Sequence, residues 1–584
     1  MTSSPHPSKL AEILVISGFL IAGNSALAAP DAGSLIRRYQ DETQQRLSPP
    51  PADKKVLTPA EPSRSRAAAS ASGERIRVSA FLVNGVTRFS QEDIAGVLKP
   101  FVGKELDTLG IHRAADELNR HYREAGYFAA KVFIPPQDVA DTIRLEVYEG
   151  YLDSQGIEVV NKGKRVKSSV VQDILETNIR SDEPINRASY ERALLIAEDL
   201  PGVTTSSTLY PGEYVGSARL RTTLSDLPLF AGNVDLDNFG AESTGQWRLG
   251  TTLYLNSPTL VGDQLVARLV TSGSRSNYAY LTYLRPISSY GTRLGASVDY
   301  FNYDADHLNN LGYSNGHASD MRLYLTHPII RSRHGNLNLR TDLSQLNIDD
   351  SNDLQVNGQR RINSLTVALQ GDDDHAWAGA GLTVFGASVT TGSVDIEGNT
   401  SYRNLDNATS ATDGGFTRVN LNLSRLQHLS AHWSIFGRLA GQWASTNLDS
   451  SQKFYVGGAT SVSGYPVGEA SGDSGADAHL ELRREFVAPW NGTLTAGLFY
   501  QHGWVKTHEN PWSGWQGTNP IIQNDITLKS FGLMASTTLD GAWVARALVG
   551  RQAGGNNMRD PNTGEASDGS TKRYRLWLQV IRYF

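Results

Sequence analysis

The feature that most constrains this chain is a long run of alternating segments that begins near Leu229 and continues to the C-terminus. In "WRLGTTLYL", Trp247, Leu249 and Leu253 alternate with Arg248 and Thr252. Apolar side chains facing lipid and polar side chains facing a lumen produce this period of two in transmembrane β-barrels. Long connections such as "EGNTSYRNLDNATSATD" alternate with short ones such as "RSRH" and "PWN". Long loops at one end and short turns at the other are typical of an outer-membrane barrel with both termini in the periplasm.

The alternating segments predict a membrane β-barrel of about 16 antiparallel strands over residues 228–584. The expected strands start near residues 229, 245, 262, 276, 291, 316, 335, 360, 378, 414, 432, 475, 492, 524, 541 and 572. We expect no helix after Leu229. The last strand ends in Phe584, and a terminal aromatic residue of this kind resembles the signal that the barrel-assembly machinery reads.

The first 28 residues have the pattern of a signal peptide. Lys9 precedes a mostly apolar run over residues 11–23, and Ala26-Leu27-Ala28 fits the cleavage rule for small residues. A membrane anchor is the alternative, but the run is too short to cross roughly 30 Å of hydrocarbon. The chain has 0 cysteines, which suits an oxidising compartment, and a net charge of −6, which gives no indication of nucleic-acid binding. We therefore expect an exported protein.

A tethered helix is predicted at the start of the mature chain. Within residues 29–47, "DAGSLIRRYQDETQQRL" predicts a polar helix with a thin apolar stripe formed by Leu35, Ile36, Tyr39 and Leu47. So short a helix is marginal alone and needs a host, and a disordered terminus is the alternative. Residues 48–74 are rich in Pro, Ala and Ser and predict a linker that spans roughly 30 Å as a loose coil.

Two repeats of one element order separate the linker from the barrel. Residues 75–150 predict β-α-α-β-β, with a capping box at Ser90 and Asp93 and a helix stop at Gly126. Residues 151–227 predict the same order. A matched order in consecutive units of similar length indicates a repeated domain.

The whole mature chain resembles the outer-membrane transporters of two-partner secretion, such as the haemolysin and filamentous-haemagglutinin transporters, within the superfamily of barrels that carry periplasmic POTRA domains. The stretches that carry the resemblance are "REAGYFAAKVFIPPQ", "DNFGAESTGQWRLG" and "FYVGGATSVSGYPVGEASGD". The resemblance implies an outer-membrane location, two POTRA domains in the periplasm, and an N-terminal helix that plugs the pore at rest.

In that family the sixth loop folds back into the lumen and its tip arginine pairs with an aspartate on strand 13. Here the loop is expected at about residues 447–474. Its tip is Val462, Ser463, Gly464 and Tyr465, and the docking strand carries Phe499, Gln501 and Gly503. Both charges are replaced, and a Ser463–Gln501 hydrogen bond would contribute about 1 kcal/mol. We expect Glu469 and Asp473 to face a polar interior or water. An ordinary exposed loop is the alternative.

The resemblance also implies a function. The POTRA domains would capture an unfolded exoprotein of the adhesin or cytolysin class, and the barrel would secrete it without ATP. Candidate contacts in the first POTRA domain are Tyr127, Phe128, Val132 and Phe133. Further expected partners are outer-membrane lipid, the barrel-assembly machinery and periplasmic chaperones. The alternatives are an insertase for other barrels, whose relatives usually have three or more POTRA domains, and a passive porin.

No catalytic set is apparent. "GDSG" at residues 472–475 and "SAHW" at residues 430–433 have some similarity to serine-protease segments, but no orienting acid or oxyanion pocket can be assembled with them. "DDDH" at residues 372–375 is a weak cation candidate at an expected short turn. We therefore expect no enzyme activity, no cofactor and no metal.

Overall fold

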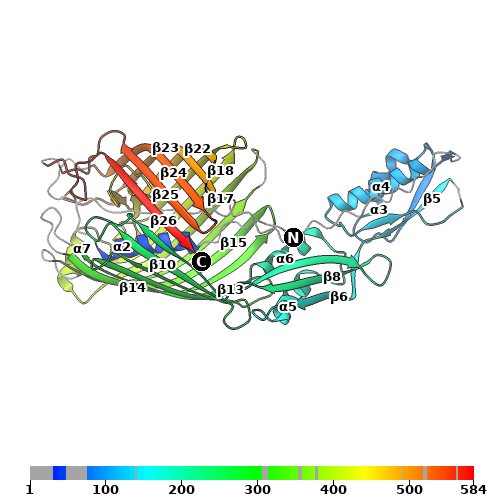
Figure 1. The fold of residues 1–584 in the computed structure, drawn as a ribbon, viewed down its shortest axis with the longest axis horizontal. Coiled ribbons are helices and arrows are strands. Elements are labelled where there is room, and N and C mark those ends of the chain that lie inside the picture. Colours follow the sequence, from blue (N-terminus) through cyan, green and yellow to red (C-terminus); the bar gives the residue numbers. More distant parts are fainter. Residues whose placement is uncertain are drawn as a thin grey trace.

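The computed structural model describes residues 31–47, 75–138, 141–305, 314–352, 358–374, 379–488, 490, 492–516, 523–560 and 563–584. It consists of a barrel and an arm of two small α/β units that projects from one end of it (Figure 1). The expected signal peptide (1–28) and linker (48–74) lie outside the described residues. None of the helices in the described part is long and apolar enough to cross a bilayer.

Sixteen antiparallel strands close into the barrel. In chain order they are β9 (Phe230–Asp237), β10 (Arg248–Asn256), β11 (Gln264–Thr271), β12 (Ser276–Pro286), β13 (Arg293–Ala305), β14 (Ser314–Arg331), β15 (Gly335–Asn352), β16 (Gly358–Asp373), β17 (Gly381–Glu397), β18 (Gly414–His428), β19 (Trp433–Ala444), β22 (Ser474–Ala488), β23 (Gly492–Lys506), β24 (Asp525–Leu539), β25 (Trp543–Gln552) and β26 (Tyr574–Tyr583). Each starts within three residues of its predicted position. The last strand pairs with the first from Gln579↔Asp237 to Tyr583↔Asn233. The predicted fold class is confirmed.

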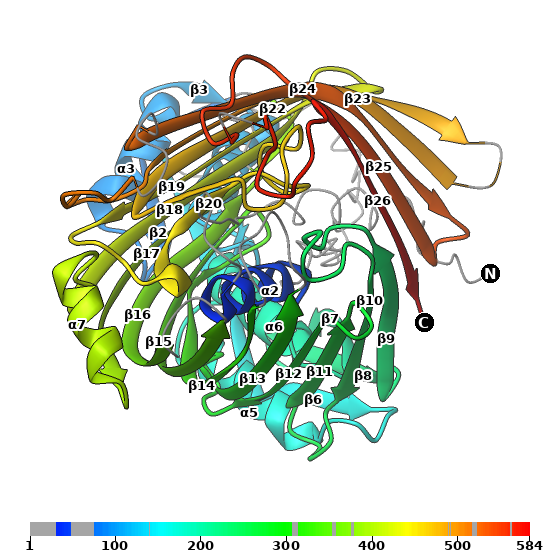
Figure 2. The same cartoon turned by 90° about the vertical axis from the view of Figure 1, so that its left-hand side faces the viewer.

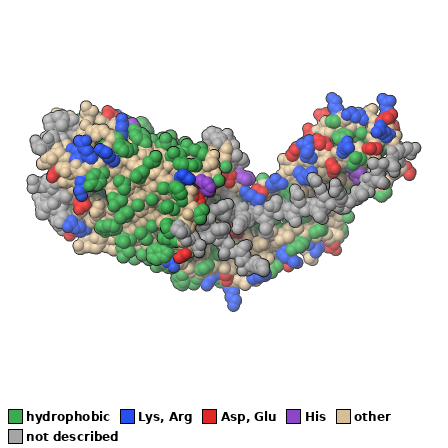
Figure 3. Space-filling model, turned by 45° about the horizontal axis from the view of Figure 1, so that its top comes forward, with side chains coloured by type: hydrophobic (Ala, Val, Ile, Leu, Met, Phe, Trp, Pro, Cys, Tyr) green, Lys and Arg blue, Asp and Glu red, His purple; other side chains and the backbone are tan. Residues whose placement is uncertain are grey.

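The side chains alternate across the barrel wall as the sequence predicts. Leu249 and Leu253 are exposed on the outer surface, whereas Arg248 and Thr252 are buried toward the lumen. Apolar side chains form a broad band across the face of the barrel shown in Figure 3. The connections at the end that carries the arm, called the turn end below, are all short, and the longest ones lie at the opposite, loop end (Figure 1).

One long loop contains a helix, so the expectation of no helix after Leu229 is wrong. Helix α7 (Thr400–Ala408) connects β17 to β18. The Asn399 side chain caps it by accepting hydrogen bonds from the Ser401 and Tyr402 backbone N–H groups. Tyr402 anchors it to the barrel, because Arg360 Nη1 donates to Tyr402 Oη at 3.1 Å. A helix this short has too few apolar residues to produce a helical period in the sequence.

The arm contains two units of the same topology. The first comprises β1 (Ile76–Arg77), β2 (Ala80–Asn84), α3 (Gln91–Leu98), the short helix η1 (Lys99–Phe101), β3 (Glu105–Leu106), α4 (Thr108–Glu124), β4 (Lys131–Phe133) and β5 (Thr142–Tyr148). The second comprises β6 (Tyr151–Asn161), α5 (Ser168–Asn178), α6 (Arg187–Glu198), β7 (Val203–Pro211) and β8 (Ser217–Asp226). Their sheets have the orders β2-β5-β4 and β6-β8-β7. The parallel neighbours are β2 and β5 in the first sheet and β6 and β8 in the second. The capping box predicted at Ser90 and Asp93 is present.

The second unit is docked on the turn end of the barrel. Lys167 N donates to Leu260 O at 3.0 Å, and Ser257 Oγ donates to Arg165 O at 2.7 Å, both in the β10–β11 turn. Asn178 donates to Ser289 O in the next turn at 3.0 Å. At a third turn, Arg331 pairs with Asp199 at 2.5 Å. Contacts to three successive turns hold this unit in one position on the barrel rim.

Candidate functional site: the occluded lumen

The lumen contains helix α2 (Ala32–Leu47), called the lumen helix below, which lies across the interior (Figure 2). Leu35, Ile36 and Tyr39 are buried against wall residues such as Phe301. The ring of Tyr39 stacks on that of Tyr278 with centroids 5.2 Å apart. Three of the four residues of the predicted apolar stripe therefore form the face that packs on β12 to β15, whereas Leu47 is half-buried and outside this cluster. The barrel wall is the host that the short helix needs.

Ion pairs hold the C-terminal end of the lumen helix. Arg46 contacts Asp235 at 3.0 Å and Asp237 at 3.2 Å on β9. Glu42 contacts Arg248 on β10 at 2.9 Å. Both of these helix charges therefore have an opposite charge on the wall. Paired charges tolerate burial far better than single ones do, so this end of the helix fits one orientation in the lumen.

Arg360 on β16 joins four elements at the N-terminal end of the lumen helix. Its guanidinium contacts Asp350 on β15 at 2.9 Å, Asp449 in the sixth loop at 2.8 Å, and Asp31, which precedes the helix, at 3.6 Å. It also donates to Tyr402 of α7. The lumen helix, the sixth loop and an outer helix thus share one cation.

The sixth loop (residues 445–473) folds inward, and it includes η2 (Ser450–Gln452), β20 (Phe454–Val456) and β21 (Ala470–Gly472). Val462 and Tyr465 of its tip are buried in a cluster with Phe454, Val456 and Val505. Phe499 lies in a neighbouring cluster. The loop is therefore part of the barrel interior and not an exposed surface loop.

The loop tip is hydrogen-bonded to the wall through neutral groups. Ser463 N and Ser463 Oγ both donate to Gln501 Oε1 at 2.8 Å, so the Ser463–Gln501 hydrogen bond expected from the sequence is present. Ser530 Oγ on β24 donates to the same oxygen at 2.7 Å. Trp577 Nε1 on β26 donates to Ser463 O at 2.8 Å. Gln552 donates to Gly464 O at 3.2 Å.

Wall glycines allow the loop to approach this closely. A Cβ on Gly503 would lie 2.2 Å from Val456 Cγ1, and a Cβ on Gly550 would lie 2.6 Å from the carbonyl carbon of Ser463. Gly503 was predicted at this site, whereas Gly550, Trp577 and Arg360 were not. Nothing in the sequence identifies these three, because they come from strands that are remote from the loop along the chain.

Glu469 and Asp473 do not face water. Both are fully buried. Glu469 accepts hydrogen bonds from the backbone and side chain of Ser567 at 3.1 and 2.6 Å. Asp473 pairs with Lys453 at 2.5 Å and accepts from Glu509 N at 2.8 Å. The loops at this end of the barrel supply these partners, which brings the carboxylates out of contact with solvent.

The four candidate contacts in the first arm unit have different surroundings. Tyr127 packs against the core of that unit, Val132 is part of it, and the Phe128 ring lies 5.5 Å from the ring of Tyr190 in the second unit. Only Phe133, on the edge strand β4, is exposed. The Val132 backbone N–H donates to Asn119 Oδ1 at 2.9 Å, so one donor of this strand is already bonded to α4.

The protease-like and cation-like stretches do not form sites. His432 lies in the turn between β18 and β19, and Ser474 begins β22 at the opposite end of the barrel. Asp372 accepts from Asn336 at 2.8 Å, Asp374 contacts His334 at 2.9 Å, and His375 lies outside the described residues. The described part of the chain contains no group of three or more His, Asp or Glu side chains that could hold a metal ion.

Two β-α-α-β-β units attached to a closed barrel of 16 strands, with a helix and an inward loop in its lumen, define an outer-membrane barrel with periplasmic POTRA domains. Residues 216–517, just over half of the chain, match the model of the haemolysin secretion/activation proteins ShlB/FhaC/HecB. Residues 76–150 match the ShlB-type POTRA domain. The chain belongs to the ShlB/FhaC/HecB family.

Comparisons with individual proteins agree with the family model. The chain is 28% identical to the heme/hemopexin transporter protein HuxB of Haemophilus influenzae (strain 86-028NP) over 593 residues, which cover 100% of both chains. It is 25% identical to the hemolysin transporter protein ShlB of Serratia marcescens over 87% of each chain. The structure of CdiB from Escherichia coli has the same fold, with a TM-score of 0.72, 19% identity, and coverage of 96% of this chain and 100% of that one.

Membership in this family establishes the location and the general activity. Its members are secretion transporters of the outer membrane that export partner proteins, and they are not enzymes. Their POTRA domains are periplasmic, so the turn end faces the periplasm and the loop end faces the cell exterior.

Proposed function

We propose that this chain captures an unfolded partner exoprotein in the periplasm and passes it through the barrel lumen to the cell surface without ATP. The observation that carries the proposal is how the lumen helix is held. Among the described residues, its contacts with the wall are side-chain ion pairs and hydrogen bonds, apolar packing, ring stacking and one hydrogen bond from its backbone, from Ala32 N to Asp350 Oδ1 at 2.8 Å. Such an element can leave the lumen without breaking any strand pairing.

The arm would receive the exoprotein. An extended chain can add to a free sheet edge, where main-chain hydrogen bonds give affinity with little demand on sequence. Strand β4 is an edge strand of the first unit, and Phe133 on it is exposed. In this proposal residues 1–28 direct export, residues 48–74 tether the lumen helix, and periplasmic chaperones keep the exoprotein unfolded. The barrel-assembly machinery, reading Phe584, would insert the barrel into outer-membrane lipid.

The proposed cargo is an exoprotein that takes part in haem or hemopexin acquisition. The support is the similarity to HuxB, which extends over the full length of both chains and includes the arm as well as the barrel. Adhesins and cytolysins are the other cargo classes. The experiment that separates them is co-expression of this chain with the exoprotein encoded beside it, followed by a haem- and hemopexin-binding assay on the secreted product.

The test of the transport route is a disulfide that ties the lumen helix to the sixth loop. A Cβ on Gly33 would lie 2.9 Å from Ser450 Oγ, close to the Cβ-to-sulfur separation of about 3 Å across a disulfide. Since the chain has 0 cysteines, Gly33→Cys/Ser450→Cys creates a single possible bond. Secretion of the exoprotein should stop in the oxidised double variant and return on reduction.

Each single-cysteine variant serves as the control and should secrete normally. Normal secretion by the fully oxidised double variant would contradict the proposal that the lumen helix leaves during transport. Deleting residues 454–473 is a less informative test, because that segment contributes Phe454, Val456, Val462 and Tyr465 to a buried cluster of the barrel.

A further inference from the structure

Four basic side chains lie on the outer, lipid-facing surface of the barrel at its extracellular end. They are His502 on β23, Lys529 on β24, Arg551 on β25 and Lys572 just before β26; we call them the basic arc. Lys529, Arg551 and Lys572 are exposed and His502 is half-buried. Figure 3 shows Lys and Arg side chains gathered at this end of the barrel, beside the apolar band.

The strand register places these side chains close together. His502 is directly opposite Lys529, and Arg551 is opposite Phe531 on one side and Tyr574 on the other. Lys529 is two residues from Phe531 on β24, so it is a diagonal neighbour of Arg551 on the same face. The exposed Lys572 precedes Tyr574 by two residues, just beyond the end of β26. Directly opposite residues have Cβ atoms about 5 Å apart and diagonal ones about 7–8 Å apart, within reach of a single phosphate for long basic side chains.

The basic arc lies at the edge of the apolar band. Tyr500, Phe531 and Tyr574 share the row of Arg551 and are exposed. Eight residues along β25 separate Arg551 from Trp543, which is exposed near the periplasmic end. With a rise of about 3.3 Å per residue and a strand tilt of about 40°, this distance corresponds to about 20 Å across the membrane, comparable with the usual band of about 25 Å. The basic arc is therefore at the level of the outer-leaflet headgroups.

The charges of the basic arc have no ion-pair partner among the described residues. Among the described residues, no carboxylate forms an ion pair with Lys529, Arg551 or Lys572, whereas nearby Lys506 is paired with Glu509 at 2.6 Å. Elsewhere at this end the outer surface carries charges of both signs, with Asp304 on β13, Asp349 on β15 and Arg361 on β16, and Asp395 on β17 is paired with Arg403 of α7 at 3.0 Å. Unpaired cations confined to one sector of the wall indicate a localised anionic ligand.

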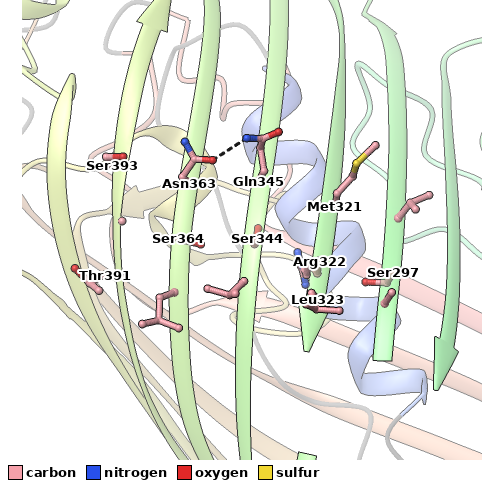
Figure 4. A pocket seen from close by; sticks show the side chains of 15 residues that line it. Ser297, Met321, Arg322, Leu323, Ser344, Gln345, Asn363, Ser364, Thr391 and Ser393 are labelled. Carbon is pink, nitrogen blue, oxygen red and sulfur yellow. Dashed lines mark hydrogen bonds between the residues drawn. The ribbon is translucent and has the colours of Figure 1, made fainter. Parts of the chain in front are cut away.

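We propose that the basic arc binds the phosphate groups of lipopolysaccharide, the phosphorylated glycolipid of the outer leaflet. The cations would contact the phosphates, and the apolar surface below them, including Leu498, Leu533 and Val549, would contact the acyl chains. The hollow in Figure 4, over β13 to β17, is lined on its outer side by Met321, Leu323 and Leu343 and presents no outward cation, so it can receive acyl chains but selects no headgroup.

The test compares Lys529→Gln/Arg551→Gln/Lys572→Gln with the matched control Arg425→Gln/Arg484→Gln/Arg582→Gln, whose arginines face outward at the periplasmic end of the same wall. Full-length protein is purified from the outer membrane, and its bound lipopolysaccharide is quantified. At about fivefold in affinity per cation, the basic-arc variant should bind lipopolysaccharide about 100-fold more weakly, and the control should match the wild type. If the basic-arc variant retained as much bound lipopolysaccharide as the wild type, the proposal would be overturned.

A second measurement uses the wild-type protein alone, so it does not depend on how the variants fold. The temperature at which the closed barrel opens in detergent is measured after addition of intact lipopolysaccharide, dephosphorylated lipopolysaccharide or phosphatidylglycerol. A ligand that binds only the native state raises this temperature, and we expect intact lipopolysaccharide alone to do so. An equal rise with dephosphorylated lipopolysaccharide, or with phosphatidylglycerol, would refute phosphate recognition or selectivity for the glycolipid, respectively.

Discussion

At the scale of residues, the sixth loop is held by a network of neutral donors and acceptors. The family resemblance implies an arginine and an aspartate where this chain has Ser463 and Gln501. Replacing both members of a buried ion pair avoids the desolvation of two charges, whereas replacing only one would leave a charge unpaired at a cost of about 3–5 kcal/mol. The neutral pair also suits the space, because Ser463 Oγ lies 2.6 Å from the position of a Cβ on Gly550.

Gln501→Leu should loosen the loop tip. The change removes the acceptor shared by Ser463 N, Ser463 Oγ and Ser530 Oγ, and each buried donor left without a partner costs about 1–3 kcal/mol. The temperature at which the barrel opens in detergent should therefore fall. The control is Gln345→Leu, the same substitution on the outer wall, where Gln345 donates to Asn363 (Figure 4). An equal effect of both variants would argue against the network.

Glu149, at the junction of the two POTRA-like units, makes the stability of the arm depend on pH. Burial acts to raise the pKa of its carboxyl group, but hydrogen bonds from Thr87, Tyr122 and the Arg88 backbone outweigh burial and lower that pKa below its ordinary value. A lowered pKa in the folded state contributes stability above the unfolded value of about 4.3, and this contribution is lost as the pH falls through the folded pKa.

Glu149→Gln should therefore destabilise residues 75–150 by about 1–3 kcal/mol at neutral pH, because buried donors lose a carboxylate acceptor. Amide hydrogen exchange in the full-length protein measures this loss. The difference in stability between Glu149→Gln and the wild type should shrink below a pH of about 4. Glu146→Gln on β5 is the matched control, and a pH-independent difference for Glu149→Gln would contradict the assignment.

At the scale of elements, long periodic patterns were predictable and isolated short elements were not. The strands were predicted to within three residues because each repeats the same alternation over eight or more residues. The lumen helix was predictable as a helix that needs a host, but Arg46 and Glu42 gave no indication of their wall partners, which lie about 200 residues away along the chain. Helix α7 is held by the Asn399 cap, by Tyr402 and by the ion pairs of Arg403, and none of these produces a helical period in the sequence.

Arg46→Gln should make the lumen helix leave the lumen more often. The variant loses contacts with Asp235 and Asp237, and charge-assisted contacts of this kind contribute about 1.5–3 kcal/mol. Single-channel recordings in planar bilayers should show open events about ten times as frequent. The matched control is Arg37→Gln, because the ion pair of Arg37 is with Asp41 in the same helix. If Arg46→Gln opened no more often than the wild type, the C-terminal end of the lumen helix would not be what restrains it in the lumen.

At the scale of the whole molecule, the contacts divide the protein into parts that are fixed and one that can move. The second arm unit is bonded to three periplasmic turns, and the sixth loop is packed into the barrel interior. The lumen helix is attached mainly through side chains and continues into a long stretch before residue 75. Opening of a route through the barrel is therefore expected to require departure of the lumen helix while the sixth loop remains in place.

A second disulfide distinguishes between these two elements. A Cβ on Gly503 would lie 3.2 Å from Val456 Cγ2, close to the Cβ-to-sulfur separation across a disulfide. The double variant Val456→Cys/Gly503→Cys can therefore form a disulfide that ties the sixth loop to β23. If the loop stays docked during transport, the oxidised variant should secrete the exoprotein at the wild-type rate, whereas oxidised Gly33→Cys/Ser450→Cys should not. Loss of secretion in both variants, restored by reduction, would mean that the loop must also move. The comparison is internally controlled, because both bonds end on the sixth loop: one ties it to the lumen helix and the other ties it to β23.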